Sequence, residues 1–159
     1  MVAQFEFELS YGQLAVFAGC LERPFNDWTT KHVSQGFAWR PNSVSFRSLV
    51  ETGKHAVALS LQERVGALHP DTVRAIDVPF DAPEDGAIEI GSIAETFPIS
   101  LSPGRFLLRC EFLASENLSV RQVRLTFASQ DVPHFAVVLA DAELSDYENL
   151  ETTAEAALG

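Results

Sequence analysis

Alternation of apolar and polar side chains in steps of two is the feature that most constrains how this sequence can fold. The first such segment is 5–11, where Phe5, Phe7, Leu9 and Tyr11 alternate with polar residues. The same period returns at 44–47, 57–61, 76–80, 88–90, 97–101, 106–112 and 123–127. Because successive side chains of a strand point to opposite faces, this pattern predicts strands with one solvent-exposed face. Few helical patterns separate the strands, so we expect an all-β fold: an antiparallel β-sandwich of about nine strands with one or two short helical turns, or, as the alternative, a closed barrel.

Several local signals predict how these strands are connected. The tetrad Ser102-Pro103-Gly104-Arg105 suits a type II turn and predicts a hairpin between segments 97–101 and 106–112. The apolar run Phe135–Leu139 predicts a strand that is buried on both faces or lies at the centre of a sheet. Short helical turns are expected at 61–68 and at 28–33, the latter with Asp27 as its N-cap.

The length of 159 residues predicts one domain. We assign residues 1–140 to the β-sandwich and residues 141–159 to an acidic tail that is frayed or forms a short helix spaced by Leu144, Tyr147 and Leu150. Cys20 and Cys110 match no metal or redox spacing, and Cys110 is expected to be a buried thiol. The chain starts without an export pattern and has no apolar run long enough to span a bilayer, which predicts a cytoplasmic protein.

Charge is the most informative property of the composition. The 22 acidic residues against 11 Lys and Arg give a net charge of −11 and an isoelectric point near 4.6. Direct binding to nucleic acid or anionic lipid is therefore not expected. No Lys or Arg occurs within 75–104 or from 125 onwards, so the negative charge is concentrated in these two segments. They are either solvated surfaces that keep the protein soluble or an acidic face that attracts a basic partner.

The sequence contains none of the common motifs for phosphate, zinc or nucleophilic chemistry, and we expect neither a metal nor a cofactor. Two sites remain as alternatives. His134 with Asp131 and a distant residue is the weak basis for a hydrolase. The loop that contains Asp81, Glu84 and Asp85 offers oxygen ligands for Ca²⁺ or a site for a small ligand, although it lacks an EF-hand pattern and a turn with solvated charges is the favoured interpretation.

A series of short motifs resembles the landmarks of the competence protein J family. In order they are Ser10-Tyr11-Gly12-Gln13, Asp27-Trp28-Thr29, Gly36-Phe37-Ala38-Trp39 and Ser43-Val44-Ser45-Phe46, followed more loosely by Val78-Pro79-Phe80, Gly86-Ala87-Ile88-Glu89-Ile90 and Pro103-Gly104. The Ala- and Glu-rich C-terminal segment and the stretch from Leu61 to Arg74 depart from this pattern. The resemblance implies a small non-enzymatic protein that binds and blocks a DNA-degrading nuclease.

The acidic charge suits that function, because a nuclease presents a positive groove to phosphates and an acidic protein can occupy it. We therefore expect a basic nuclease as the partner and leave the formation of a homo-oligomer open. Tight binding also needs aromatic anchors, for which Trp28, Phe37 and Trp39 are candidates by residue type, although core packing is the favoured role of all three. The predicted partner-binding residues are Asp77, Asp81, Glu84, Asp85, Glu89, Trp28 and Trp39.

Overall fold

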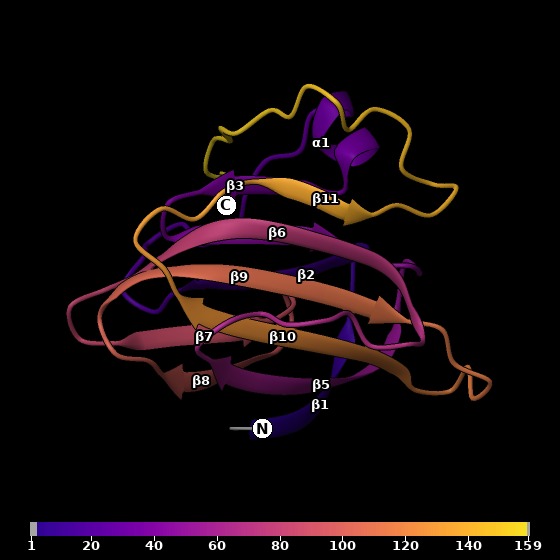
Figure 1. The fold of residues 1–159 in the computed structure, drawn as a ribbon, viewed down its shortest axis with the longest axis horizontal. Coiled ribbons are helices and arrows are strands. Elements are labelled where there is room, and N and C mark those ends of the chain that lie inside the picture. Colours follow the sequence, from indigo (N-terminus) through magenta and orange to yellow (C-terminus); the bar gives the residue numbers. More distant parts are fainter. Residues whose placement is uncertain (1–2, 159) are drawn as a thin grey trace.

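The computed structural model describes residues 3–158 and packs two β-sheets face to face (Figure 1). The six-stranded sheet has the order β1-β5-β10-β9-β6-β11, and the five-stranded sheet has the order β3-β4-β2-β7-β8. The elements are β1 (Ala3–Leu9), β2 (Gln13–Ala18), α1 (Thr30–Gln35), β3 (Phe37–Arg40), β4 (Ser43–Arg47), β5 (Gly53–Gln62), β6 (Thr72–Ala82), β7 (Ala87–Gly91), β8 (Thr96–Ser100), β9 (Gly104–Leu113), β10 (Arg121–Ser129) and β11 (Ala136–Leu139). The predicted β-sandwich is confirmed, with eleven strands in the described part of the chain where about nine were expected.

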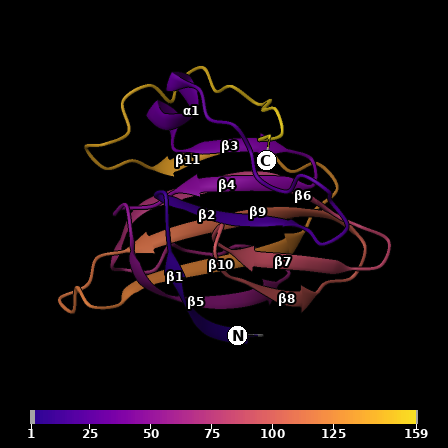
Figure 2. The same ribbon diagram turned by 180° about the vertical axis from the view of Figure 1, so that it is seen from behind.

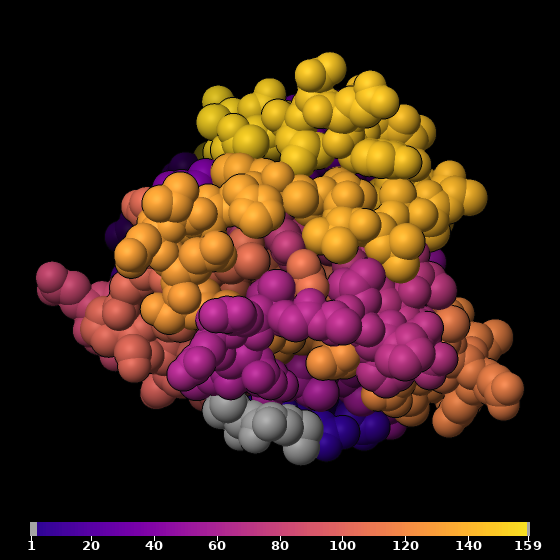
Figure 3. All heavy atoms as spheres, in the orientation of Figure 1, coloured from indigo at the N-terminus to yellow at the C-terminus, as the bar shows by residue number. Residues whose placement is uncertain are grey.

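One pair of neighbouring strands departs from the expected antiparallel pattern. β5 and β10 run parallel, with Val57 opposite Val123 and Leu59 opposite Leu125. The next strand in sequence after β5 is β6, which lies beyond β10 and β9 in the sheet, so residues 63–71 must cross over both. These residues contribute to the magenta atoms over the middle of the face shown in Figure 3. This crossing covers the outer face of the six-stranded sheet.

The core between the sheets is rich in phenylalanine. Phe37 and Phe46 enter it from the five-stranded sheet, and Phe80, Phe112 and Phe127 enter it from the six-stranded sheet; all are at most 2% exposed. The rings of Phe80 and Phe127 meet edge to face with centroids 5.9 Å apart, a preferred geometry for aromatic pairs. Large rigid rings therefore fill the space between the layers.

The sequence pattern predicts neither β2 nor β3. For β2 the reason is that its outer face is buried. Ala15 and Phe17 point outward from β2 but are buried, so the strand shows no polar alternation. They are covered by residues 19–29, which cross the five-stranded sheet and are held where Asn26 Nδ2 donates to the carbonyl of Ala38 at 2.9 Å. Figure 2 shows β2, β4 and β7 of this sheet from its own side.

The hairpin predicted around Pro103-Gly104 is wrong. β8 pairs with β7 in the five-stranded sheet, whereas β9 pairs with β6 and β10 in the six-stranded sheet. The turn therefore passes the chain from one sheet to the other, which local turn chemistry cannot distinguish from a hairpin.

Two further local predictions are also wrong. The segment 61–68 forms no helical turn, because β5 continues to Gln62 along its parallel partner and the chain then crosses the sheet. The run at 135–139 is not a central strand: β11 lies at the edge of its sheet, with Val138 40% and Leu139 36% exposed.

α1 is the one helix among residues 3–158, and it begins later than predicted. Thr29, not Asp27, is the N-cap: its Oγ1 accepts from the backbone N–H of His32, whose ring Nδ1 accepts from the N–H of Thr29. Gly36 ends the helix with a φ of 94°, and a Cβ there would lie 2.9 Å from Ile76 Cδ1. Glycine is thus required for both backbone conformation and close packing. No helix in the described part of the chain is long and apolar enough to cross a membrane.

The C-terminal segment is neither frayed nor helical between residues 141 and 158. It lies beside α1 and β3 as an irregular chain (yellow in Figure 1). Backbone hydrogen bonds join Asp27 N–H to the Glu155 carbonyl and Ala157 N–H to the Phe25 carbonyl, both at 2.8 Å. Leu144 is 5% exposed and packs at Gly36. Partners on the rest of the fold therefore replace the local bonds that a helix would make.

Candidate functional site

The predicted acidic segment is divided between the two sheets, and its carboxylates have different environments. Asp77 is 2% exposed on β6, where both of its oxygens accept from Arg109, at 2.7 and 2.9 Å. Arg109 also donates to the carbonyl of Gly66 in the crossing segment. The pKa of Arg109 is raised, mainly by its hydrogen bond to Asp77 and to a smaller extent by the attraction between the two charges. Asp77 is part of a covered ion pair and is not available to a partner.

The remaining carboxylates of this segment are accessible but largely engaged within the chain. Asp81 pairs with Arg105 at 3.2 Å, and Asp85 accepts from the N–H of Ala87 at 3.0 Å. Glu89, on β7 in the other sheet, accepts from Thr96 Oγ1 at 2.6 Å. Glu84 is exposed at the turn between β6 and β7.

The alternative sites for Ca²⁺ and for hydrolysis gain no supporting geometry. Among residues 3–158, no group of three or more His, Cys, Asp or Glu side chains is arranged to hold a metal ion. Asp81 and Asp85 have the partners described above. His134 and Asp131 are both exposed, and His134 lines a cavity of about 340 Å³ together with the Asp77–Arg109 pair.

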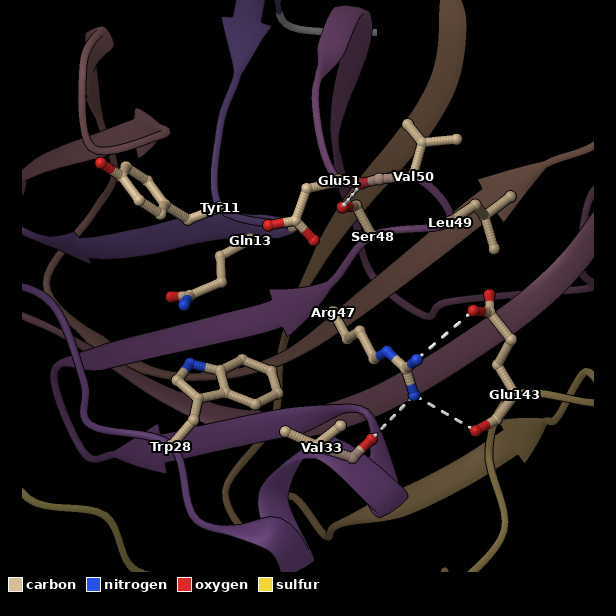
Figure 4. A pocket seen from close by; sticks show the side chains of 11 residues that line it. Tyr11, Gln13, Trp28, Val33, Arg47, Ser48, Leu49, Val50, Glu51 and Glu143 are labelled. Carbon is tan, nitrogen blue, oxygen red and sulfur yellow. Dashed lines mark hydrogen bonds and ion pairs between the residues drawn. The ribbon is translucent and has the colours of Figure 1, made fainter.

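The two tryptophans have different environments. Trp39 is anchored in the fold, since its Nε1–H donates to the carbonyl of Pro79 at 2.6 Å and its ring meets Phe135 edge to face. Trp28 is half-buried and lies over the outer face of the five-stranded sheet (Figure 4). Its Nε1–H is buried and has no hydrogen-bond partner among the described residues. Of the two tryptophans, Trp28 is therefore the one with an unsatisfied hydrogen-bond donor.

A cavity of about 280 Å³ opens beside Trp28 (Figure 4). Its walls include Tyr11, Val33 and Glu51, from the β1–β2 turn, α1 and the segment after β4. Arg47 is the one basic residue in the lining, and its guanidinium donates to the carbonyl of Val33 and to Glu143 Oε2 at 3.2 and 3.3 Å. The positive charge of Arg47 is thereby neutralised within the chain.

Tyr11 is the most exposed large hydrophobic residue that lines this cavity. Its side chain is 66% exposed, and its φ of 58° is the one left-handed value among the described non-glycine residues. The conformation is held because Gly12, the next residue, donates to the Glu51 carbonyl at 2.8 Å and accepts from Ser48 N–H at 2.9 Å. A bulky residue in this region of φ is unusual and often marks a functional position.

Trp28 also lines a second cavity, of about 590 Å³. It is lined by Asp27, Trp28, Thr29, His32, Glu151, Thr153, Ala154 and Glu155, and thus by three carboxylates and no Lys or Arg. Glu151 Oε1 accepts from both Thr153 Oγ1 and Thr153 N–H, at 2.6 and 3.1 Å, and these bonds lower the pKa of Glu151. His32 Nε2–H donates to the Thr153 carbonyl at 2.9 Å and fixes the tail there.

Together the two cavities form an acidic surface around one aromatic ring. We name it the Trp28 surface and define it by Tyr11, Asp27, Trp28, Glu51, Glu151 and Glu155. None of its four carboxylates takes part in an ion pair among residues 3–158. Of this surface the sequence predicted only Trp28. Its carboxylates are far apart in sequence, so no local pattern predicts that they meet. The Tyr11-Gly12 and Asp27-Trp28 motifs were the only sequence signals that pointed to this part of the chain.

A family model described as Competence protein J (ComJ) matches residues 6–128 of this chain. The chain belongs to this family. The competence protein J match contains Tyr11, Asp27, Trp28 and Glu51 and stops before β11, so Glu151 and Glu155 lie in a segment beyond it.

A solved structure supports the same fold. It is the crystal structure of ComJ, inhibitor of the DNA degrading activity of NucA, from Bacillus subtilis. The likeness has a TM-score of 0.66 at 22% sequence identity and covers 80% of this chain and 96% of that chain. No curated protein matches this chain.

Proposed function

We propose that this protein inhibits a DNA-degrading nuclease by binding to it, and that it is not itself an enzyme. The observation that carries the proposal is the competence protein J family match together with the fold of the Bacillus subtilis inhibitor. The net charge of −11 gives it a physical basis, because a nuclease that binds phosphates attracts an acidic protein over long range. We propose a basic surface of the nuclease as the partner.

The test is a titration of the purified protein into a DNA-degradation assay with the NucA-type nuclease of the same organism. We expect full inhibition near a simple molar ratio, with an apparent Kd that rises with salt because charge attraction is screened. A folded protein that leaves the active nuclease uninhibited at every ratio would overturn the proposal. Bovine serum albumin, another acidic protein, is the control for a non-specific effect of negative charge.

We also propose a cytoplasmic location. Cys20 and Cys110 are both unpaired, which suits a reducing compartment. Burial raises the pKa of Cys110 well above its ordinary value, so that thiol is unreactive, whereas Cys20 is exposed. Fractionation of cells that express the tagged protein tests the location, and recovery outside the cytoplasm would contradict it.

A further inference from the structure

The Trp28 surface has the chemistry to receive a basic side chain. A guanidinium or ammonium group is attracted to the face of an aromatic ring and to unpaired carboxylates, and both are present here. Asp27, Glu151 and Glu155 line one cavity together with Trp28, while Glu51 and Tyr11 line the other cavity that Trp28 borders. Arg47, the one Lys or Arg in the two linings as described, is engaged by Glu143 and Val33.

Two further observations single out this surface from other acidic parts of the chain. The buried Nε1–H of Trp28 has no acceptor among residues 3–158, which is rare in native structures, and an acceptor on a bound chain would satisfy it. Tyr11 is held in a left-handed conformation that leaves its ring projecting. Exposed, pre-positioned aromatic residues are enriched among those that dominate binding energy.

We propose that the Trp28 surface is the site at which the nuclease docks, and that it takes an Arg or Lys side chain of the nuclease between the Trp28 ring and the surrounding carboxylates. This inference rests on the proposed inhibitor function. It replaces the acidic segment around Glu84 and Glu89 as the principal interface, because the carboxylates of that segment are divided between two sheets and two of them, Asp77 and Asp81, are paired with arginines.

The test compares two triple variants with the same change in net charge. The first is Asp27→Asn with Glu51→Gln and Glu151→Gln; the amide oxygen at residue 151 can still accept from Thr153. The matched control is Glu84→Gln with Asp85→Asn and Glu95→Gln. We expect the first variant to raise the Kd for the NucA-type nuclease at least about tenfold and the control to raise it less than about threefold. Equal effects of the two variants, at unchanged melting temperatures, would overturn the proposal.

A second measurement separates this inference from the proposed function. The two tryptophans give two indole N–H resonances, and that of Trp39, which donates to Pro79, is an internal reference. We expect the peptide acetyl-Gly-Arg-Gly-amide to shift the Trp28 resonance selectively, and the uncharged citrulline peptide to leave it unchanged. No selective shift would overturn the basic side-chain site.

The outcomes are therefore distinguishable. If the wild-type protein fails to inhibit the nuclease, the proposed function fails and the peptide titration decides on the surface alone. If the first triple variant instead dissociates a homodimer of the wild-type protein, the surface is a self-interface and the proposal is overturned.

Discussion

At the scale of single residues, Tyr11 combines a strained backbone conformation with an exposed side chain. The left-handed conformation costs an ordinary residue about 1–2 kcal/mol, whereas glycine adopts it without steric penalty but loses more entropy on folding. At 66% exposure the Tyr11 ring contributes little to packing. Packing within the fold therefore does not account for this ring, which is exposed to a partner.

The variant Tyr11→Gly tests that explanation. We expect a free energy of unfolding between unchanged and about 1 kcal/mol higher, because strain is relieved. We also expect at least about tenfold weaker inhibition of the nuclease, because a central aromatic contact is lost. Urea denaturation and the DNA-degradation assay measure the two quantities. A less stable variant that inhibits as well as the wild type would contradict both parts.

His55 is the second informative residue, and it makes stability depend on pH. It is 1% exposed, its Nδ1–H donates to the Gly53 carbonyl, and its Nε2 has no partner among the described residues. Burial, the largest cause, and the charge of Arg121 lower its pKa, opposed by the hydrogen bond to Gly53 and the charge of Glu8. The ring of Phe7 lies against it.

Because the folded state disfavours the protonated form of His55, the unfolded chain binds more protons than the folded chain at acidic pH. Stability is therefore expected to fall as the pH drops below the ordinary histidine pKa of about 6.5, by up to about 1.4 kcal/mol per pH unit from this residue. His55→Leu removes this contribution. Urea denaturation at pH 7.5 and 5.5 should show a smaller decrease for the variant, and parallel decreases in the two proteins would contradict the assignment.

At the scale of elements, the C-terminal segment is joined to the sandwich by a buried arginine. Arg74 on β6 is fully buried, with its Nε and Nη2 donating to the two oxygens of Asp141 at 2.9 Å. Its Nη2 also donates to Glu143 at 3.1 Å, and its Nη1 donates to the Arg47 carbonyl at 2.6 Å. This network holds one end of the segment that supplies Glu151 and Glu155.

Asp141→Asn should destabilise the protein by about 2 kcal/mol or more, because it leaves the buried charge of Arg74 only partly compensated. The matched control is Asp146→Asn, which alters the partly exposed pair with Lys31 and should cost less than about 1 kcal/mol. Thermal and urea denaturation give both values. A similar small effect of the two substitutions would show that the buried network does not hold the segment.

Alternation of apolar and polar residues in the sequence predicted strands correctly. The prediction failed where tertiary contacts bury the outer face of a strand and where contacts between distant residues replace local structure. Ile76, Val78 and Phe80 alternate with Asp77, Pro79 and Asp81 along β6, and of these three outward residues Pro79 and Asp81 are partly exposed. β2 lost its alternation because residues 19–29 cover Phe17. The helix expected in the tail is replaced by bonds from Gln35 to residue 151, which no local pattern encodes.

At the scale of the whole molecule, the net charge of −11 favours a basic partner but does not locate the surface that would bind it. The acidic stretch from Asp77 to Glu95 is continuous in sequence, yet β6 and β7 carry it into different sheets. The Trp28 surface instead assembles carboxylates from residues 27, 51, 151 and 155, which only the fold brings together. Family membership was predictable because the motifs of the family are local in sequence. The Trp28 surface was not predictable because its residues come from distant parts of the chain.

Amide hydrogen exchange of this protein, alone and with the NucA-type nuclease, tests the account most directly because it reports both binding and its location. We predict slower exchange in the complex at residues 11–13, 27–29, 50–52 and 151–155, with little change at 84–95. Protection confined to 84–95, or no protection at all with an active nuclease in excess, would contradict the account.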